Sequence, residues 1–396
     1  MKDLRKALQQ RRAEHLYRAR RIVDGPQQPA MKIDGRDVIS FCSNDYLGLA
    51  NHPAVKAAFI AAVEKYGAGS GAAHLINGHS RAHHLLEQEL AAFTGYPRAL
   101  LFSTGYMANL GVAQALAGRG DTVLEDRLNH ASLLDAGLLS GARLVRYAHN
   151  DAGELEHKLG SRESGEKLVL SDGVFSMDGD IADLPSLATV CARHDAWFMV
   201  DDAHGFGVLG ETGRGSLEHF GLAAGGIPIY MATLGKALGV AGAFIAGSEE
   251  LIETLINTAR TYIYTTASPP AVAEAARASL GLIRHRPELR AGLHDNIRYF
   301  RTCAAQAALP LVTSTTAIQP LIIGDTAATV SLSERLFEAG LLVTAIRPPT
   351  VPQGTARLRL TLSTAHTHAQ IDRLVGALEA LFTDRNRPDP ASNKTE

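Results

Sequence analysis

Short apolar runs alternate with glycine-rich turns and helical patterns through the middle of the chain, from about residue 45 to residue 280. Each run is short and is bounded by charged or turn residues, which is typical of buried strands in a parallel sheet. Alternating strands and helices predict an α/β fold, a doubly wound and mostly parallel sheet covered by helices. The expected strands are residues 99–102, 122–125, 167–170, 196–200 and 227–232.

The two ends of the chain follow other patterns. Leucines at positions 4, 8 and 16 among many arginines predict a helix to about residue 23, and residues 31–41 resemble a hairpin turning at Asp34-Gly35. After the break at Ser268-Pro269-Pro270, a helical pattern covers residues 271 to about 305. Strands at 321–323 and 357–362 and helices at 331–338 and 369–382 predict a smaller α+β domain. The expected parts are an N-terminal arm (1–45), a large domain (46–280), a C-terminal domain (281–384) and a mobile polar tail (385–396).

Composition narrows the class of protein. The 396 residues are 46% hydrophobic and 20% charged with a net charge of −2, so the chain is globular and has no general attraction to nucleic acid or anionic membranes. No apolar run approaches the roughly 18 residues of a membrane span, and the arginine-rich N-terminus is not a secretory signal. Three scattered cysteines indicate a reducing compartment. We expect a cytoplasmic protein with no nucleic-acid or membrane partner.

Two motifs carry the chemistry: Asp201-Asp202-Ala203-His204-Gly205, and Thr233-Leu234-Gly235-Lys236-Ala237. Each follows an apolar run, and ligands of open α/β sheets bind beyond the carboxyl ends of the strands. Pyridoxal phosphate (PLP) needs a carboxylate at its ring nitrogen, a ring near its face and an amine for covalent attachment. Asp201, His204 and Lys236 are residues of these three kinds.

Other interpretations of each motif exist. Asp and His are also metal ligands, and Asp201 could cap a helix. Nothing in the sequence has the spacing of zinc ligands, so no metal is expected. A lone Lys is most often an ordinary surface residue. The order of the two motifs, each at a strand end, favours the PLP site.

Further candidates stand at predicted turns. Gly105 and Tyr106 open a helix whose N-terminus could hold a phosphate, although a plain turn fits equally. His130 could stack on a heterocycle or simply pack. Ser176 follows a strand end. Arg357 and Arg359 share one face of a strand, where a guanidinium could bind a carboxylate or protect a sheet edge.

With these motifs in order, the chain resembles the α-oxoamine synthases, a family of fold-type I PLP-dependent transferases. The resemblance runs from about Arg18 to Leu381. It is carried by residues 43–49 (SNDYLGL), 129–151, 173–180 (GVFSMDGD), 200–205 and 233–236. Family members often have Gly-Ser-Gly-Gly-Ser/Thr-Arg where this chain has residues 69–74, GSGAAH.

The resemblance implies roles for the matching residues. Catalytic roles fall to Lys236, His204, Asp201 and His130: Lys236 attaches PLP and transfers a proton, Asp201 pairs with the ring nitrogen, and His130 stacks on the ring and faces the substrate. His204 and Ser176 would lie at the phenolic oxygen. The phosphate would be held by Gly105, Tyr106 and Thr233, and by Thr265 and Thr266 from the second subunit of a homodimer. The substrate residues would be Arg18, Asn44 and Thr350, with Arg359 taking the amino-acid carboxylate.

Residues 346–362 are most similar to the family member of biotin biosynthesis. The implied reaction is a decarboxylative condensation of L-alanine with a pimeloyl thioester, carried on CoA or acyl carrier protein. The alternatives are family members that join glycine to acetyl-CoA or succinyl-CoA, or that make sphingoid bases from serine and palmitoyl-CoA. Alanine and glycine differ by one methyl group, worth about 1–3 kcal/mol in a pocket. A catalytically inactive subunit with the same fold is a further alternative, against which the presence of Lys236 and Asp201 argues.

Overall fold

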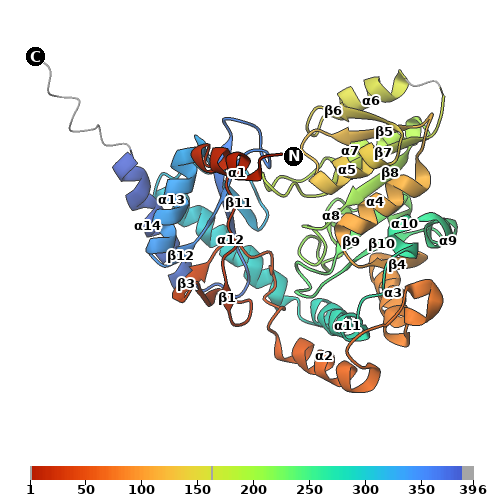
Figure 1. Ribbon diagram of the computed structural model, residues 1–396, viewed down its shortest axis with the longest axis horizontal. Coiled ribbons are helices and arrows are strands. Elements are labelled where there is room, and N and C mark those ends of the chain that lie inside the picture. The colour runs from red at the N-terminus through yellow and green to blue at the C-terminus, as the bar shows by residue number, and fades with distance from the viewer. Residues whose placement is uncertain (1, 162–163, 386–396) are drawn as a thin grey trace, which may run out of the picture. The chain divides into compact units, whose positions relative to one another are not determined.

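The computed structural model describes residues 2–161 and 164–385, which form two compact units (Figure 1). One unit comprises residues 47–176 and 180–290. The other comprises residues 1–46, 177–179 and 291–396. The tail expected at residues 385–396 begins at the last described residue and otherwise lies outside the described part of the chain.

A seven-stranded sheet organises the unit of residues 47–176 and 180–290, with strand order β4-β10-β9-β8-β7-β5-β6. Six strands run in one direction, and β10 alone of the seven runs antiparallel to both of its neighbours, β4 and β9. The mostly parallel sheet predicted from the sequence is confirmed. The strands are β4 (Arg98–Phe102), β5 (Thr122–Asp126), β6 (Arg143–Tyr147), β7 (Lys167–Asp172), β8 (Trp197–Asp201), β9 (Ile229–Thr233) and β10 (Ala243–Gly247).

Helices flank this sheet, and the sequence sets several of their ends. Asp151 and Asp183 cap the helices that follow them, because each carboxylate accepts a backbone N–H of the first turn. The α-helices are α2 (Pro53–Tyr66), α3 (Arg81–Thr94), α4 (Gly105–Leu116), α5 (Ala131–Leu139), α6 (Ala152–Gly160), α7 (Leu184–Arg193), α8 (Ser216–His219), α9 (Glu249–Thr258), α10 (Arg260–Ile263) and α11 (Pro270–His285). Two short helical turns are η1 (His74–Gly78) and η2 (Ala224–Gly226).

The core of this unit lies between the sheet and its helices. Leu168, Leu170 and Met199 on the central strands are fully buried, and they pack with Val112 of α4 and Leu133 of α5. Both faces of the central strands are covered, which explains why the sequence shows continuous apolar runs there rather than alternation.

The other unit contains two small sheets with orders β1-β2-β3-β12 and β11-β14-β13. The predicted hairpin is confirmed, since β2 and β3 pair antiparallel around Asp34 and Gly35, both with positive φ. The strands are β1 (Val23–Asp24), β2 (Ala30–Ile33), β3 (Arg36–Ser40), β11 (Ile318–Gly324), β12 (Leu341–Leu342), β13 (Thr344–Ile346) and β14 (Ala356–Thr361). The helices are α1 (Leu4–Ala13), α12 (Glu288–Gln306), α13 (Thr326–Glu338) and α14 (His368–Arg385).

Two predicted helices differ from the observed ones. The N-terminal helix ends at Ala13 rather than near residue 23, because His15 adopts a left-handed conformation (φ 56°) and no helix residue is buried to extend the packing. The single helix expected over residues 271–305 is two helices, α11 and α12, separated at Arg286 and Pro287. A proline fits the start of a helix and not its interior. Pro287 therefore separates α11 from α12.

No described helix is long and apolar enough to cross a membrane.

Candidate active site

Asp201 is the last residue of β8 and is 4% exposed at the carboxyl edge of the sheet. Its Oδ2 accepts a hydrogen bond of 2.8 Å from the side-chain amide of Asn109 on α4. Its Oδ1 accepts one of 3.0 Å from the backbone N–H of Ala203. These two donors fix the orientation of the carboxylate and supply the hydrogen bonds that a buried polar group requires.

Lys236 lies in the turn that follows β9. Its Nζ is 2.8 Å from Nε2 of His204, in the loop after β8. The turn is closed by Gly239, whose φ is +68° and whose Cα approaches the backbone of Leu49 and Ala50 too closely for a side chain. The amine and the imidazole therefore meet, although 32 residues separate them in the sequence.

A pocket of about 180 Å³ brings most of the predicted cofactor residues together. Eight of them line it: Gly105, Tyr106, His130, Ser176, Asp201, His204, Thr233 and Lys236. Thr265 and Thr266, which the resemblance assigns to the second subunit, do not line this pocket.

His130 caps the N-terminus of α5, where its Nδ1 accepts the N–H of Ser132. Burial lowers the pKa of His130, and the nearby Lys236 lowers it further, while Asp201 opposes both. The imidazole is therefore neutral at physiological pH. An uncharged ring at this position is suited to stacking on a flat heterocycle.

Asp172 ends β7 beside Asp201 and accepts the backbone N–H of His130 at 2.9 Å. Burial raises the pKa of Asp172 well above its usual value, and the neighbouring carboxylate of Asp201 adds to the shift. Two buried carboxylates cannot both ionise cheaply at close range. Asp201, with its two hydrogen-bond donors, is the one better suited to carry the negative charge.

Asp202 anchors the loop beneath the pocket. Its Oδ2 accepts hydrogen bonds of 2.8 Å from the N–H of Ser216 and from the hydroxyl of Tyr230. A side chain at Gly205 or at Gly215 would overlap this carboxyl group. Burial raises the pKa of Asp202 to about 7. The second Asp of the motif thus shapes the loop, whereas the first faces the pocket.

The chemistry of these residues fits PLP. The N-terminus of α4 begins at Gly105 with Thr104 as its cap, and free N–H groups there suit a phosphate. A Cβ on Gly105 would lie 2.7 Å from the methyl group of Met231, so a larger residue here would require that side chain to move. Lys236 supplies an amine and Asp201 a carboxylate, and both line the same pocket.

Arg18, Asn44, Thr350 and Arg359, predicted to bind the substrate, lie in the unit of residues 1–46, 177–179 and 291–396. They form two hydrogen-bonded pairs there. Nη2 of Arg18 donates to the hydroxyl of Thr350 at 3.3 Å. Nη1 and Nη2 of Arg359 both donate to Oδ1 of Asn44 at 3.3 Å, and Arg359 is 7% exposed. Arg357, its neighbour on the same strand face, instead forms an ion pair with Asp178 at 2.5 Å.

Sequence reasoning missed three residues at or beside the pocket. Asn109 does not line the pocket, and its bond to Asp201 across 92 residues has no sequence signal. Ser132 joins Asn109 and His130 through its hydroxyl, at 2.8 and 2.7 Å. Asp172 could have been found, because it follows an apolar strand as Asp201 does.

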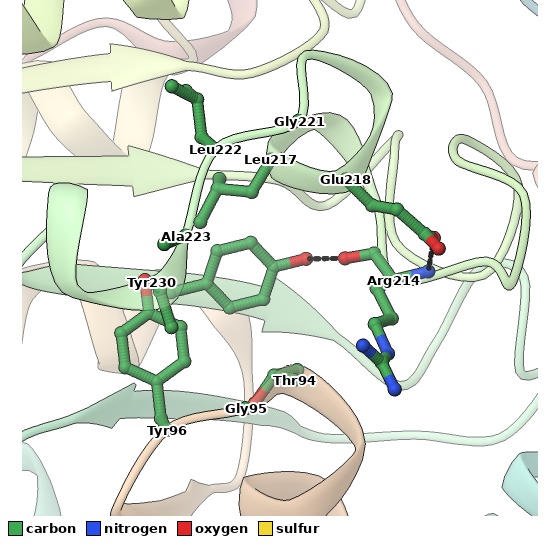
Figure 2. A pocket seen from close by; sticks show the side chains of 11 residues that line it. Thr94, Gly95, Tyr96, Arg214, Leu217, Glu218, Gly221, Leu222, Ala223 and Tyr230 are labelled. Carbon is green, nitrogen blue, oxygen red and sulfur yellow. Dashed lines mark hydrogen bonds between the residues drawn. The ribbon is translucent and has the colours of Figure 1, made fainter.

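A larger cavity of about 360 Å³ lies elsewhere in the same unit (Figure 2). It is lined by two tyrosines, Tyr96 and Tyr230, together with Arg214, Glu218 and small or apolar residues. Tyr230 donates to the backbone oxygen of Arg214 at 3.2 Å, and Glu218 accepts the backbone N–H of Arg214 at 3.0 Å. No lysine or histidine lines it, so it lacks the groups that bind and use PLP.

Comparison with known proteins gives a consistent result. The family model "Aminotransferase class I and II" matches residues 36–378. The 8-amino-7-oxononanoate synthase of Thioalkalivibrio sulfidiphilus is 64% identical over 380 residues, covering 96% of this chain and 97% of that protein. That of Nitrosococcus oceani is 62% identical, covering 94% and 98%.

Solved structures of related enzymes have the same fold as this chain. A serine palmitoyltransferase of Sphingomonas wittichii has a TM-score of 0.91 at 34% identity and covers 96% of this chain and 97% of its own. Other serine palmitoyltransferase structures with a TM-score of 0.91 contain PLP. The 8-amino-7-oxononanoate synthase of Francisella tularensis has a TM-score of 0.77 at 32% identity, covering 88% and 99%.

The sheet, the pocket and these comparisons define a fold-type I, PLP-dependent transferase, and PLP is its cofactor. Within the aminotransferase class I and II family, the chain belongs to the 8-amino-7-oxononanoate synthases.

Proposed function

We propose that the protein condenses L-alanine with a pimeloyl thioester in biotin biosynthesis. A carbon–carbon bond forms between the α-carbon of alanine and the thioester carbonyl, and the carbon–sulfur bond breaks. The alanine carboxylate leaves as carbon dioxide, and a proton takes its place. The products are 8-amino-7-oxononanoate, carbon dioxide and the free thiol of the carrier.

The observation that carries this proposal is the placement of Lys236 and His204 at 2.8 Å in a pocket that Asp201 also lines. The alanine α-proton is too weakly acidic for an amine to remove at neutral pH without help. PLP, when bound, supplies an electron sink that makes the α-carbon acidic and nucleophilic. A positioned amine and imidazole then suffice to move the protons.

Each side chain has a distinct task. Lys236 holds the cofactor covalently through Nζ and afterwards carries the α-proton. Asp201 would keep the ring nitrogen of bound PLP protonated, because an ionised carboxylate stabilises the opposite charge beside it. His130 would cover the face of the ring. His204 holds a proton near the phenolic oxygen, with Ser176, and polarises the ketone during decarboxylation. The phosphate is held by Gly105, Tyr106 and Thr233.

The substrate residues complete the proposal. Arg359 binds the carboxylate of alanine, since a guanidinium can make two parallel hydrogen bonds to it. Asn44, which accepts from the same guanidinium, orients it. Arg18 and Thr350 contact the acyl donor. That donor is pimeloyl-CoA or pimeloyl-acyl carrier protein, and both supply the same thioester carbonyl.

We also propose a homodimer in the cytoplasm whose active sites are shared between subunits. Thr265 and Thr266 would reach the phosphate of the second subunit, and they do not line the pocket of their own chain. Tyr264 beside them is 72% exposed, so this segment is accessible to a second subunit. The three cysteines are free thiols, as in a reducing compartment.

A substrate panel tests the proposed reaction. The purified enzyme loaded with PLP would be given L-alanine, glycine or L-serine, each with pimeloyl, acetyl, succinyl or palmitoyl thioesters, and thiol release would be followed. The combination of alanine with the pimeloyl donor should be fastest. Faster release with glycine and acetyl-CoA would instead support the glycine-using alternative.

A further inference from the structure

Four histidines gather where η1 meets the start of α3, outside the PLP pocket: His74, His79, His83 and His84. Two sets of groups have ligand atoms that all lie within 4.8 Å of one another. One set is His74, His79 and His83, and the other is His79, His84 and Glu87.

The first set is already occupied by hydrogen bonds. Nδ1 of His83 accepts the backbone N–H of Ser80 at 3.0 Å and closes the N-terminal cap of α3. Its Nε2 is 2.8 Å from the backbone oxygen of Ser268, to which it donates. Both nitrogens of His83 are therefore used, and no lone pair remains for a metal ion.

In the second set, by contrast, His79 retains a ring nitrogen that can bind a metal ion. His79 lies 3.0 Å from His74 through the Nδ1 atoms, so His74 can accept that proton and leave the lone pair of His79 on Nε2. This Nε2 faces Oε2 of Glu87 at 3.8 Å, which is too long for a hydrogen bond. Two atoms bound about 2.1 Å from one zinc ion in a tetrahedron lie about 3.4 Å apart, close to the observed separation.

Glu87 and His84 complete the set. Oε1 of Glu87 accepts the backbone N–H of Leu101 at 3.0 Å, which orients the carboxyl group and leaves Oε2 towards His79. His84 follows His83 on α3, its ring lies at 85° to that of His79, and its ring nitrogens make no hydrogen bond with any described residue.

We propose that His79, His84 and Glu87 bind a divalent transition-metal ion, for which zinc is the best match, with His74 as the residue that positions His79. Two imidazoles and one carboxylate form a set that zinc prefers, with a fourth position left for water. A group that accepts the second ring proton of a histidine ligand fixes its tautomer and orientation. Single-turn π-helical segments such as η1 are common at functional sites.

The proposed ion would join His79, the residue that follows η1, to α3. Neither His79, His84 nor Glu87 lines the PLP pocket, so the ion would act on the structure of this segment rather than on the condensation. This site was not predicted from the sequence, because His79 precedes α3 whereas His84 and Glu87 lie on it, and the three do not have the spacing of a known zinc motif.

Competitive zinc titration tests this site. The chelator-treated enzyme, loaded with PLP, would be titrated with zinc against a chromogenic chelator of known affinity. We expect one tightly bound zinc per chain. Loss of a positioning group costs about 10–100-fold in metal affinity, which is the expected effect of His74→Gln. Loss of a ligand in His84→Gln or Glu87→Gln should cost at least as much.

Matched controls keep the result interpretable. His157→Gln, at an exposed histidine of α6, should bind zinc as the unaltered protein does. Zinc should also raise the melting temperature of the unaltered protein and not that of His84→Gln. The visible absorbance of bound PLP reports whether each variant is folded and loaded. Equal zinc affinity in the unaltered protein and His84→Gln, or no tight zinc in either, would overturn the proposal.

Discussion

The side chains of the pocket are held by hydrogen bonds between residues far apart in the sequence. Asn109 orients Asp201, and Lys236 meets His204, in each case across the carboxyl edge of the sheet. Such positioning places reacting groups before a substrate arrives, which is a large part of what an enzyme contributes to rate. Single substitutions should therefore separate cofactor attachment from substrate binding.

Lys236→Ala removes the amine that, in the proposed mechanism, attaches PLP and moves the α-proton. We expect the visible absorption band of the lysine-bound cofactor to disappear and the rate to fall by at least about 100-fold, the usual contribution of a positioned acid or base. Absorbance spectra and thiol release would measure both. Lys158→Ala, on α6, is the control and should leave the spectrum unchanged. An unaltered spectrum in Lys236→Ala would refute the assignment of this lysine.

Arg359→Gln and Arg357→Gln form a matched pair on one strand. Charge-assisted hydrogen bonds contribute about 1.5–3 kcal/mol, so Arg359→Gln should raise the KM for alanine by about 10–100-fold. Arg357 is paired with Asp178, and its loss should lower the melting temperature with little change in KM. Steady-state kinetics and thermal unfolding would distinguish them. A larger KM effect for Arg357→Gln would reverse the two roles.

At the scale of elements, His149 connects three segments of the large sheet unit. It lies 3.0 Å from Asp126, at the end of β5, and 2.9 Å from Asp180, in the loop before α7. Burial alone would lower its pKa, but the hydrogen bonds and charges of the two carboxylates outweigh it and raise the pKa to about 10. The protonated imidazole is thus the state that holds these loops together.

This shift predicts a pH dependence of stability. A pKa raised on folding stabilises the protein fully below the unfolded value of about 6.5, and the contribution is lost as pH rises to about 10. His149→Gln should lower the free energy of unfolding most near pH 6 and much less above pH 10. Urea unfolding across this range would measure it. A pH-independent difference between the two proteins would contradict the account.

The sequence predicted buried elements better than exposed ones. The apolar runs before Asp201 and Thr233 became β8 and β9, because burial on both faces demands continuous hydrophobicity. The helix after Leu4 was predicted too long, since its side chains have no packing partners to extend it. β10, Ala243–Gly247, was missed because only Phe244 and Ile245 carry strand propensity, and alanine and glycine flank them.

At the scale of the whole molecule, the sequence predicted most of the residues that line the pocket, but not the hydrogen bonds that connect them. Residues at strand ends could be placed by the rule that parallel strands present their carboxyl ends to a ligand. The bonds of Asn109 and Ser132 depend on how α4 and α5 pack, which no local pattern encodes. Substrate identity depends on single methyl groups, and it came from relatives rather than from physical reasoning.

The proposed sharing of active sites between the subunits of a homodimer predicts complementation. Lys236→Ala and the double variant Thr265→Ala/Thr266→Ala should each be impaired as homodimers. Mixed and refolded together, they form heterodimers in which one site has both its own lysine and the threonines of the partner. Activity above the sum of the separate variants is expected. Unchanged activity in a mixture shown by mass spectrometry to contain heterodimers would mean that each chain completes its own site.

The central claim is a decarboxylative condensation at the Lys236 pocket, and isotope tracing tests it most directly. The enzyme would be incubated with carboxyl-labelled L-alanine and a pimeloyl thioester, and the products identified by mass spectrometry. The account predicts labelled carbon dioxide, unlabelled 8-amino-7-oxononanoate and free thiol in equal amounts, and none of them with Lys236→Ala. Thiol release without loss of the labelled carboxyl group, or the same products from Lys236→Ala, would contradict it.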